Sequence, residues 1–253
     1  MKVPTALALA ALVTAGCVGG GQPALSYFES VRQSLGCGGA LCFDEVLALE
    51  DGLVYMKQGN ASGYWVSFCN ADGQKLYALF SMLDAQLEGK TLVDCRDCGT
   101  YHLFYNSGSE TRYLSVPTGQ NDLEGFHGKA KEVCLSNADA GLIHVIWGVN
   151  GEYTDYHIFS NDVVVYERFG LREGELLDSR AYRSEGVFAR LTSIVHDDFF
   201  ESNTKDNCPK DGLFYGFVEA AVGHRHREYF TCGDDTPAGG AFTALKDEVG
   251  GLS

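Results

Sequence analysis

The chain has 253 residues, of which 45% are hydrophobic, and a formal net charge of −15. This length and apolar content support a folded core of one large domain or two small ones and exclude a wholly disordered chain. The acidic charge argues against nucleic acid as a partner, because binding to phosphates requires Lys and Arg. It also argues against peripheral attachment to anionic lipid.

Residues 1–16 follow the order of a secretory signal peptide. Lys2 supplies a positive charge, residues 3–13 are almost wholly apolar, and small residues follow at positions 14–16. The apolar run covers about 11 residues, whereas a helix that spans a membrane needs roughly 20. The segment is therefore predicted to be a signal that is removed, and not a permanent anchor.

The end of this signal, Val13-Thr-Ala-Gly-Cys17, resembles the lipobox of bacterial lipoproteins. Thr14 departs from that pattern, in which an aliphatic residue is usual. The resemblance implies cleavage before Cys17, lipidation of this cysteine and attachment to a membrane through the lipid chains, with residues 17–24 as a tether. Val18, where Asp would mark retention in the inner membrane, favours the outer membrane and leaves open a periplasmic or a surface position. Ordinary signal cleavage after Ala15 is the alternative.

The cysteine count supports the same interpretation. The chain has nine cysteines, and lipidation of Cys17 would leave eight. An even set of cysteines in an exported chain predicts disulfide bonds. The eight are Cys37, Cys42, Cys69, Cys95, Cys98, Cys134, Cys208 and Cys232.

Four blocks of sequence recur in the same order in the two halves of the chain, which indicates an internal repeat. We predict a first unit over residues 25–136 and a second over residues 141–253, with the seam near 137–141. The matched blocks are 44–56 with 155–167 at an offset of 111, 76–87 with 188–199 at 112, 98–105 with 208–215 at 110, and 126–133 with 242–249 at 116.

Each unit is predicted to contain strands, a helix, a hairpin and a closing helix. Asp51-Gly52 is typical of a tight turn between two alternating segments. The second unit opens with a strand over 142–147, which favours a strand at 27–32, where the pattern alone also allows a helix. The expected fold is α+β, with two similar units, each an antiparallel sheet with two helices packed on one face. In the first unit we expect strands at 45–50, 53–55 and 63–69, a helix at 76–87 after a cap at Asn70 or Asp72, a hairpin over 101–106 and 111–116, and a helix at 122–134.

The opening of the first unit resembles a family of bacterial extracytoplasmic domains of unknown function. The residues that carry the resemblance are Arg32, the loop Cys37-Gly-Gly-Ala-Leu-Cys42 and Leu49-Glu-Asp-Gly-Leu-Val-Tyr55. Phe43 stands where the family usually has Pro, and the second unit lacks both cysteines. The resemblance implies a fold and an extracytoplasmic location, and no chemistry.

Disulfide pairing is predicted from the expected hairpins. Cys208 and Cys232 would face each other across the hairpin of the second unit, within the separation that a disulfide requires. In the first unit, Cys37–Cys42 would close a loop. For the other four cysteines we favour Cys95–Cys98 with Cys69–Cys134 over crossed pairings. Cys95-Arg-Asp-Cys98 has the spacing of thiol oxidoreductases, but it follows a helix and precedes a hairpin, so a structural disulfide is expected.

The sequence has weak candidates for metal binding. His224 and His226 would lie on one face of a strand, a spacing that can chelate a metal, but no third ligand is identifiable. His196 and Asp198, at the end of a helix, would add ligands only if the fold brings them there. Ser202-Asn-Thr-Lys205 has the Ser-x-x-Lys pattern of penicillin-recognising enzymes, but no Lys-Thr-Gly strand follows it.

These observations predict a cell-envelope lipoprotein that binds or scaffolds, without catalytic activity or a cofactor. Its partners would be the membrane, through the lipid anchor, and an envelope protein or a small-molecule ligand. The alternative is an envelope hydrolase or metal-dependent enzyme that uses His196, Asp198, His224 and His226.

Overall fold

The computed structural model describes ten stretches of the chain. Cys17 and most of the predicted tether lie outside them, as do the cysteines at positions 37, 42, 95, 98, 208 and 232. The described residues are 24–33, 43–60, 63–87, 100–107, 111–117, 121–149, 152–170, 176–201, 216–231 and 237–252.

The first part of the described chain forms a seven-stranded antiparallel sheet. Its strand order is β6-β5-β1-β2-β3-β4-β7. The strands are β1 (Tyr27–Gln33), β2 (Phe43–Leu49), β3 (Leu53–Asn60), β4 (Gly63–Ala71), β5 (Thr100–Asn106), β6 (Thr111–Pro117) and β7 (Cys134–Asn137), and the helices are α1 (Gly73–Leu87) and α2 (Asn121–Glu132).

The second part forms a six-stranded antiparallel sheet in the order β11-β10-β9-β8-β12-β13. Apart from β7, its elements follow one another in the same order as those of the first sheet. They are β8 (Leu142–Val149), β9 (Glu152–Phe159), β10 (Val163–Phe169), β11 (Leu176–Arg183), α3 (Val187–Thr192), α4 (Asp197–Glu201), β12 (Gly216–Val222), β13 (Arg225–Thr231) and α5 (Pro237–Gly250).

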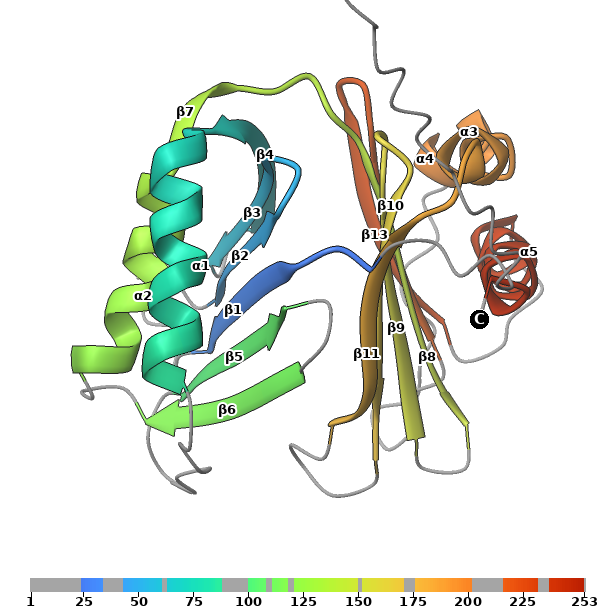
Figure 1. Ribbon diagram of the computed structural model, residues 1–253. Helices are drawn as coiled ribbons and strands as arrows, with labels where there is room; N and C mark the ends of the chain where they lie inside the picture. The colour runs from blue at the N-terminus through green and yellow to red at the C-terminus, as the bar shows by residue number, and fades with distance from the viewer. Residues whose placement is uncertain are drawn as a thin grey trace, which may run out of the picture.

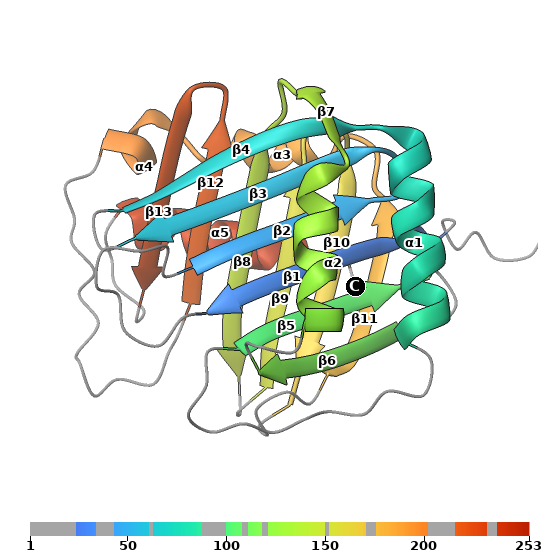
Figure 2. The ribbon, with the colours of Figure 1, turned by 90° about the vertical axis from the view of Figure 1, so that its left-hand side faces the viewer.

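The elements stack in four layers (Figure 1). Helices α1 and α2 cover the outer face of the first sheet, and α3, α4 and α5 cover the outer face of the second. The inner faces of the two sheets pack against each other, with the strands of one sheet running across those of the other (Figure 2). The α+β class with antiparallel sheets is therefore as predicted, whereas the packing of one sheet on the other had no counterpart in the sequence interpretation.

Alternation along the strands builds three apolar cores. Between the first sheet and its helices, residues such as Phe28 and Val46 pack on Leu79 and Phe126. A matching core lies between the second sheet and its helices. The third core lies between the sheets and includes Tyr27, Leu47, Leu49, Tyr55, Leu142, Phe159, Val163 and Val165.

Local sequence signals explain where α1 begins and where the turn between β2 and β3 ends. Asp72 caps α1, because its Oδ1 accepts hydrogen bonds from the backbone N–H groups of Gln74 and Lys75 at 2.9 and 3.2 Å. The turn between β2 and β3 ends at Gly52, whose φ of 98° suits glycine.

Two expected helix boundaries were wrong. The single helix expected over 188–199 is divided into α3 and α4, with residues 193–196 in turns. The helix expected to reach Cys134 ends at Glu132, and Cys134 begins β7, which pairs with β4. Strand β7 thereby leads from the first sheet toward β8, along the seam expected at 137–141.

Strand pairing corrects the register of the first repeated block. Gly52 and Asp162 both have positive φ, and each donates its backbone N–H to the residue three positions earlier. The two turns therefore correspond at an offset of 110 residues, whereas the sequence blocks were matched at an offset of 111. A shift of one residue moves each side chain to the other face of a strand, so Asp155 corresponds to Glu45 and not to Asp44.

The third repeated block was also placed incorrectly. Strand β5 pairs with β1 so that Tyr105 lies opposite Phe28, and β12 pairs with β8 so that Ala220 lies opposite Ile143. The position in the second sheet that corresponds to Tyr105 is therefore Ala220, not Tyr215, and the strand that corresponds to β5 begins only at Gly216.

Within the described stretches, no helix combines the length and the apolar character needed to cross a bilayer.

Candidate functional site

Charged side chains gather between the sheets, beyond one end of the third apolar core. On these strands, a charged residue lies two positions from an apolar residue of the third core. In β1, Glu29 follows Tyr27 by two positions, and in β2, Glu45 precedes Leu47 by two positions. Because side chains two positions apart share a face, both members of each pair face the other sheet. We name this set the inter-sheet cluster: Glu29, Glu45, Lys57, His144, Asp155, His157, Glu167, Glu219, His226 and Glu228.

Two histidines and an aspartate form the centre of the inter-sheet cluster. His144 in β8 lies directly opposite His157 in β9, and their rings stack with centroids 3.8 Å apart. Asp155 Oδ1 lies 2.9 Å from His144 Nε2 and 3.5 Å from His157 Nδ1. One carboxylate oxygen thus contacts a nitrogen of each imidazole.

The other nitrogen of each imidazole faces a second carboxylate. His144 Nδ1 lies 3.5 Å from Glu219 Oε2, and His157 Nε2 lies 3.4 Å from Glu45 Oε1. Neither contact has hydrogen-bond geometry. His144 Nδ1, both ring nitrogens of His157, Glu45 Oε1 and Glu29 Oε2 are buried and have no hydrogen-bond partner. Buried polar atoms are nearly always paired in folded proteins, so this group of atoms requires an explanation.

Lys57 neutralises the neighbouring part of the inter-sheet cluster. Its Nζ lies 3.0 Å from Glu219 Oε2 and 2.5 Å from Glu228 Oε1. Glu219 Oε1 also lies 2.7 Å from His226 Nε2. Burial alone would lower the pKa of Lys57, but the charges of Glu219, Glu45 and Glu228 outweigh it and raise the pKa, so this ammonium stays charged.

Electrostatics separate the acids of the inter-sheet cluster into two groups. Burial raises the pKa of Glu29 well above its usual range, and the charges of Glu167, Glu45 and Asp155 raise it further. Burial and the charge of Asp155 also raise the pKa of Glu167 to about 8. For Asp155, burial acts in the same upward direction, but the two histidines outweigh it and lower the pKa.

His144 is the charged partner of these acids. Burial opposes its protonation, but Asp155 and Glu219 raise the pKa of His144 to about 10. The same contacts, with Lys57, overcome burial and hold the pKa of Glu219 well below its usual range. The raised pKa values keep Glu29 and Glu167 protonated at neutral pH, whereas the lowered pKa values keep Asp155 and Glu219 ionised. Asp155 and Glu219 face the two cationic groups, Lys57 and His144.

Two adjoining cavities open onto the inter-sheet cluster. The larger, of about 240 Å³, is lined by acids and histidines of the cluster and by apolar side chains that include Phe104 and Phe169. The smaller, of about 210 Å³, is lined by Lys57, Glu228 and four aromatic rings. Glu45, His144, Phe43 and Ile146 line both cavities.

Two groups of side chains have the composition and spacing to hold a metal ion. In the first, one ligand atom each from His144, Asp155 and His157 lie within 4.8 Å of one another. The second group is Glu219, His226 and Glu228. Across the described stretches, these are the groups of three or more such residues that meet this distance.

A Ser–His–Asp arrangement occurs on the other face of the first sheet. His127 Nδ1 lies 2.9 Å from Ser30 Oγ, and His127 Nε2 lies 3.2 Å from Asp44 Oδ2. Ser30 has no exposed surface, so its hydroxyl is closed to a substrate. Lys131 and Gln58 also contact Asp44, which indicates a polar contact between α2 and the sheet.

The histidines singled out from the sequence do not form one site. His224 lies in the exposed turn before β13, and not on the strand as expected, because the strand begins at Arg225. His226, an exposed residue, contacts the buried Glu219. His196 and Asp198 line a separate cavity of about 390 Å³ against α5. The four do not meet as a metal-ligating group, because the second sheet separates its inner face from the helix layer.

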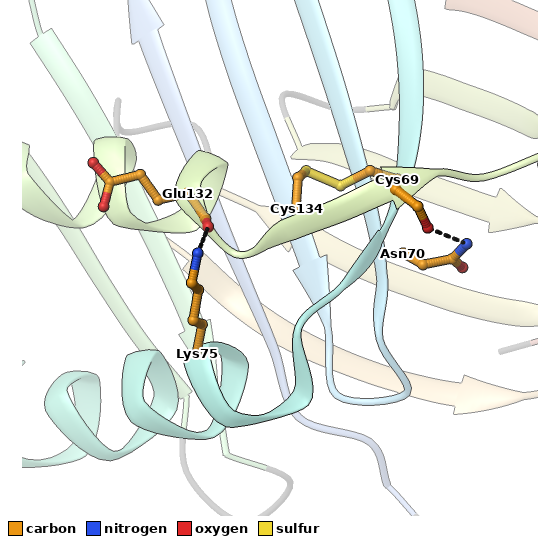
Figure 3. Close-up of a disulfide and its surroundings, with 6 residues drawn as sticks. Cys69, Asn70, Lys75, Glu132 and Cys134 are labelled. Atoms are coloured by element: carbon orange, nitrogen blue, oxygen red, sulfur yellow. Dashed lines mark hydrogen bonds between the residues drawn. A yellow bond between two sulfur atoms is a disulfide. The ribbon is translucent and has the colours of Figure 1, made fainter.

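One predicted cysteine pair lies within the described residues. Cys69 in β4 and Cys134 in β7 form a disulfide, with their Cα atoms 5.6 Å apart (Figure 3). Nearby, Lys75 Nζ donates to the backbone carbonyl of Glu132 at 3.1 Å. The bond joins neighbouring strands and is the pairing favoured from the sequence. The pairs Cys37–Cys42, Cys95–Cys98 and Cys208–Cys232 lie outside the described residues and stay predictions.

Comparison with models of protein families, with curated proteins and with solved structures finds no match to this chain. The resemblance to extracytoplasmic domains of unknown function therefore stays a prediction, and the candidate function rests on the geometry of the site.

Proposed function

We propose that this protein is a lipid-anchored binding protein of the bacterial cell envelope, and that the inter-sheet cluster binds a small cation. The observation that carries the proposal is the set of buried atoms without hydrogen-bond partners around the larger cavity, on Glu29, Glu45, His144 and His157. Leaving such an atom unpaired costs about 1–3 kcal/mol. A bound ligand that contacts these atoms would offset that cost.

Charge supports a cation over an anion or a neutral ligand. The inter-sheet cluster has six carboxyl groups beside one lysine and three histidines, and Glu45 Oε1 lacks a hydrogen-bond donor. In an environment of low dielectric constant, an uncompensated negative charge is costly. An anion would add to that cost, whereas a cation would reduce it.

Two copies of one module would explain how the site is built. The order of β6-β5-β1-β2-β3-β4 in one sheet corresponds strand by strand to β13-β12-β8-β9-β10-β11 in the other. Glu45 and Asp155 occupy corresponding positions and both line the larger cavity. We propose that the modules arose by duplication and that the ligand site lies where they face each other.

The signal-like residues 1–16 and Cys17 support the proposed location in the cell envelope, with attachment to the outer membrane through lipid. Binding between rigid sheets needs no catalytic residue, so we propose a binding function and not an enzymatic one.

Calorimetric titration of the chelator-treated full chain tests the proposal. The probes are Zn²⁺, Mn²⁺, Ca²⁺, putrescine and choline, each titrated separately at pH 7. We expect saturable binding of at least one probe, and weaker binding by Glu45→Gln, which removes the charge while keeping the size of the side chain.

The matched control is Glu185→Gln, which makes the same change at an exposed turn. It should bind as the unaltered chain does. The proposal is wrong if no probe binds, or if Glu45→Gln and Glu185→Gln bind every probe equally well.

A further inference from the structure

We infer that the cation is a divalent transition metal ion held by His144, Asp155 and His157. The inference rests on the proposed binding function of the inter-sheet cluster and names its ligand class. The three side chains come from neighbouring strands β8 and β9, and each is largely buried. A site on paired strands is rigid, which favours an ion with a demanding geometry.

The distances fit a shared ion. Ligand bonds of about 2.0–2.2 Å in a tetrahedral site place neighbouring ligand atoms roughly 3.3–3.6 Å apart. Asp155 Oδ1 lies 2.9 Å from His144 Nε2 and 3.5 Å from His157 Nδ1. A metal ion between these atoms would replace the hydrogen bond that now joins Asp155 to His144, with a rotation of the stacked imidazole rings so that both ring planes point at the ion.

The outer contacts fit the same assignment. If His144 Nε2 and His157 Nδ1 bind the ion, the opposite nitrogens carry protons and face Glu219 and Glu45, at 3.5 and 3.4 Å. Histidines that bind metal ions usually donate their second N–H to a carboxylate or a carbonyl, which fixes the orientation of the ring. Both histidines here have such a carboxylate, and neither has yet formed the hydrogen bond.

The ligand types select among metal ions. Two imidazoles and one carboxylate suit Zn²⁺, Fe²⁺, Co²⁺ or Mn²⁺, whereas Ca²⁺ and Mg²⁺ prefer sites made of oxygen ligands. Three protein ligands also leave a coordination position for a further ligand, and the larger cavity lies beside them. We therefore expect a small molecule or water to complete the site.

The second group of possible ligands already has a cation. Lys57 Nζ lies between Glu219 and Glu228, at 3.0 and 2.5 Å, and its pKa is raised by these charges. A metal ion bound to Glu219, His226 and Glu228 would have to displace this ammonium. At His144, Asp155 and His157 the competitor is the proton of His144, which a metal ion would displace, and not an ammonium group.

The experiment measures metal content and Zn²⁺ affinity of the full chain and of two histidine variants. We expect one Zn²⁺ per chain. In His157→Gln, the affinity should fall by more than the roughly 10–100-fold that the loss of an outer carboxylate costs. His224→Gln changes a histidine in the exposed turn before β13, outside the inter-sheet cluster, and serves as the control. Its affinity should stay within about threefold of the unaltered chain, a change that corresponds to less than 1 kcal/mol.

A second measurement uses the unaltered chain, so its result does not depend on whether the variants fold. X-ray absorption of the Zn²⁺-loaded unaltered chain should show two imidazole ligands, and Co²⁺ should give the visible absorption of a site with nitrogen and oxygen ligands. Zn²⁺ bound without imidazole, or bound equally well by His157→Gln and His224→Gln, would overturn the inference.

The outcomes separate this inference from the proposed function. If Zn²⁺, Mn²⁺ and Co²⁺ fail to bind while putrescine or choline binds in a manner that depends on Glu45, the metal assignment is wrong and the cation-binding site stands. If no probe binds, both are wrong.

Discussion

His144 and His157 stack face to face between the sheets, on strands that pair directly, and one oxygen of Asp155 contacts a nitrogen of each ring. A charged imidazole beside a second imidazole is unfavourable unless a negative charge lies next to both. Asp155 supplies that charge, and its lowered pKa reflects both histidines. The carboxylate is therefore expected to stabilise the chain even without a bound ligand.

The first prediction concerns this carboxylate. Asp155→Asn in the presence of a chelator should lower the free energy of unfolding by about 3–5 kcal/mol, because it leaves a charged His144 buried without its partner. Urea unfolding followed by circular dichroism measures the change. Asp247→Asn, an exposed position on α5, should change the value by less than about 0.5 kcal/mol. Equal effects of the two substitutions would contradict the role given to Asp155.

A second prediction follows from the pKa of Glu167, which burial raises to about 8. The folded chain keeps this proton, whereas the unfolded chain releases it near pH 4.3. Unfolding between these two pH values therefore releases a proton, and the free energy of unfolding falls as pH rises through that window. Glu167→Gln removes the titration and keeps the oxygen that accepts from Tyr27.

We expect Glu167→Gln to be more stable than the unaltered chain at pH 7.5 by on the order of 2–4 kcal/mol, since one pKa unit corresponds to about 1.36 kcal/mol. Its stability should also vary less between pH 5 and 8. Urea unfolding at a series of pH values, with a chelator present, measures both effects. An unchanged slope with pH would show that Glu167 is ionised in the folded chain.

Local signals in the sequence predicted the elements well, because they act within a few residues. The turn at Asp51-Gly52, the cap at Asp72 and the helical spacing of Leu76, Leu79 and Leu83 each describe a short segment, and each lies in the expected element. Boundaries were less accurate where the chain leaves a helix, as at Glu132, since no glycine or proline marks the end.

The site was missed because its residues are brought together by the packing of one sheet on the other. Glu45 and Lys57 alternate with apolar residues, a pattern that usually indicates a face in contact with water. The signal that could have found the site is in β8, where His144 lies within Leu142-Ile-His-Val-Ile146. A strand that is apolar on both faces is covered on both faces, so a histidine within it is buried and needs a partner.

The third prediction concerns the contact between β12 and α5. A Cβ atom added at Gly216 would lie 2.1 Å from the ring of Phe242, which is itself buried. Gly216→Ala should therefore lower the free energy of unfolding by about 1–3 kcal/mol, the usual cost of an overpacked core. Gly240→Ala, on the same helix as Phe242 but in open space, should stabilise the chain by up to about 1 kcal/mol, because alanine favours a helix.

Thermal or urea unfolding measures both alanine variants. The change in the free energy of unfolding should be negative for Gly216→Ala and positive for Gly240→Ala if the glycine at 216 is required for close packing. A loss of stability in both variants would instead indicate that α5 tolerates little change at any position.

The fourth prediction tests the lipid anchor. Cys17→Ala removes the only thiol that the lipobox resemblance assigns to lipidation, so the variant should appear in a soluble or unprocessed form. Fractionation of bacterial cells that express the chain, followed by mass measurement, distinguishes the outcomes. Cys69→Ala also removes a thiol, but it should leave the distribution between membrane and soluble fractions unchanged. Membrane attachment and normal maturation of Cys17→Ala would exclude lipidation at this residue.

The last prediction concerns the disulfides. The bond between Cys69 and Cys134 closes a loop with a sequence separation of 65 residues, and the chain-entropy model gives about 4 kcal/mol for a loop of this size. Cys69→Ala with Cys134→Ala should lower the free energy of unfolding by a similar amount. Non-reducing peptide mapping of the unaltered chain should recover this pair and, within the second unit, a peptide that joins Cys208 to Cys232. A bridge from Cys208 to any cysteine of the first unit would contradict the picture of two modules that each complete their own disulfides.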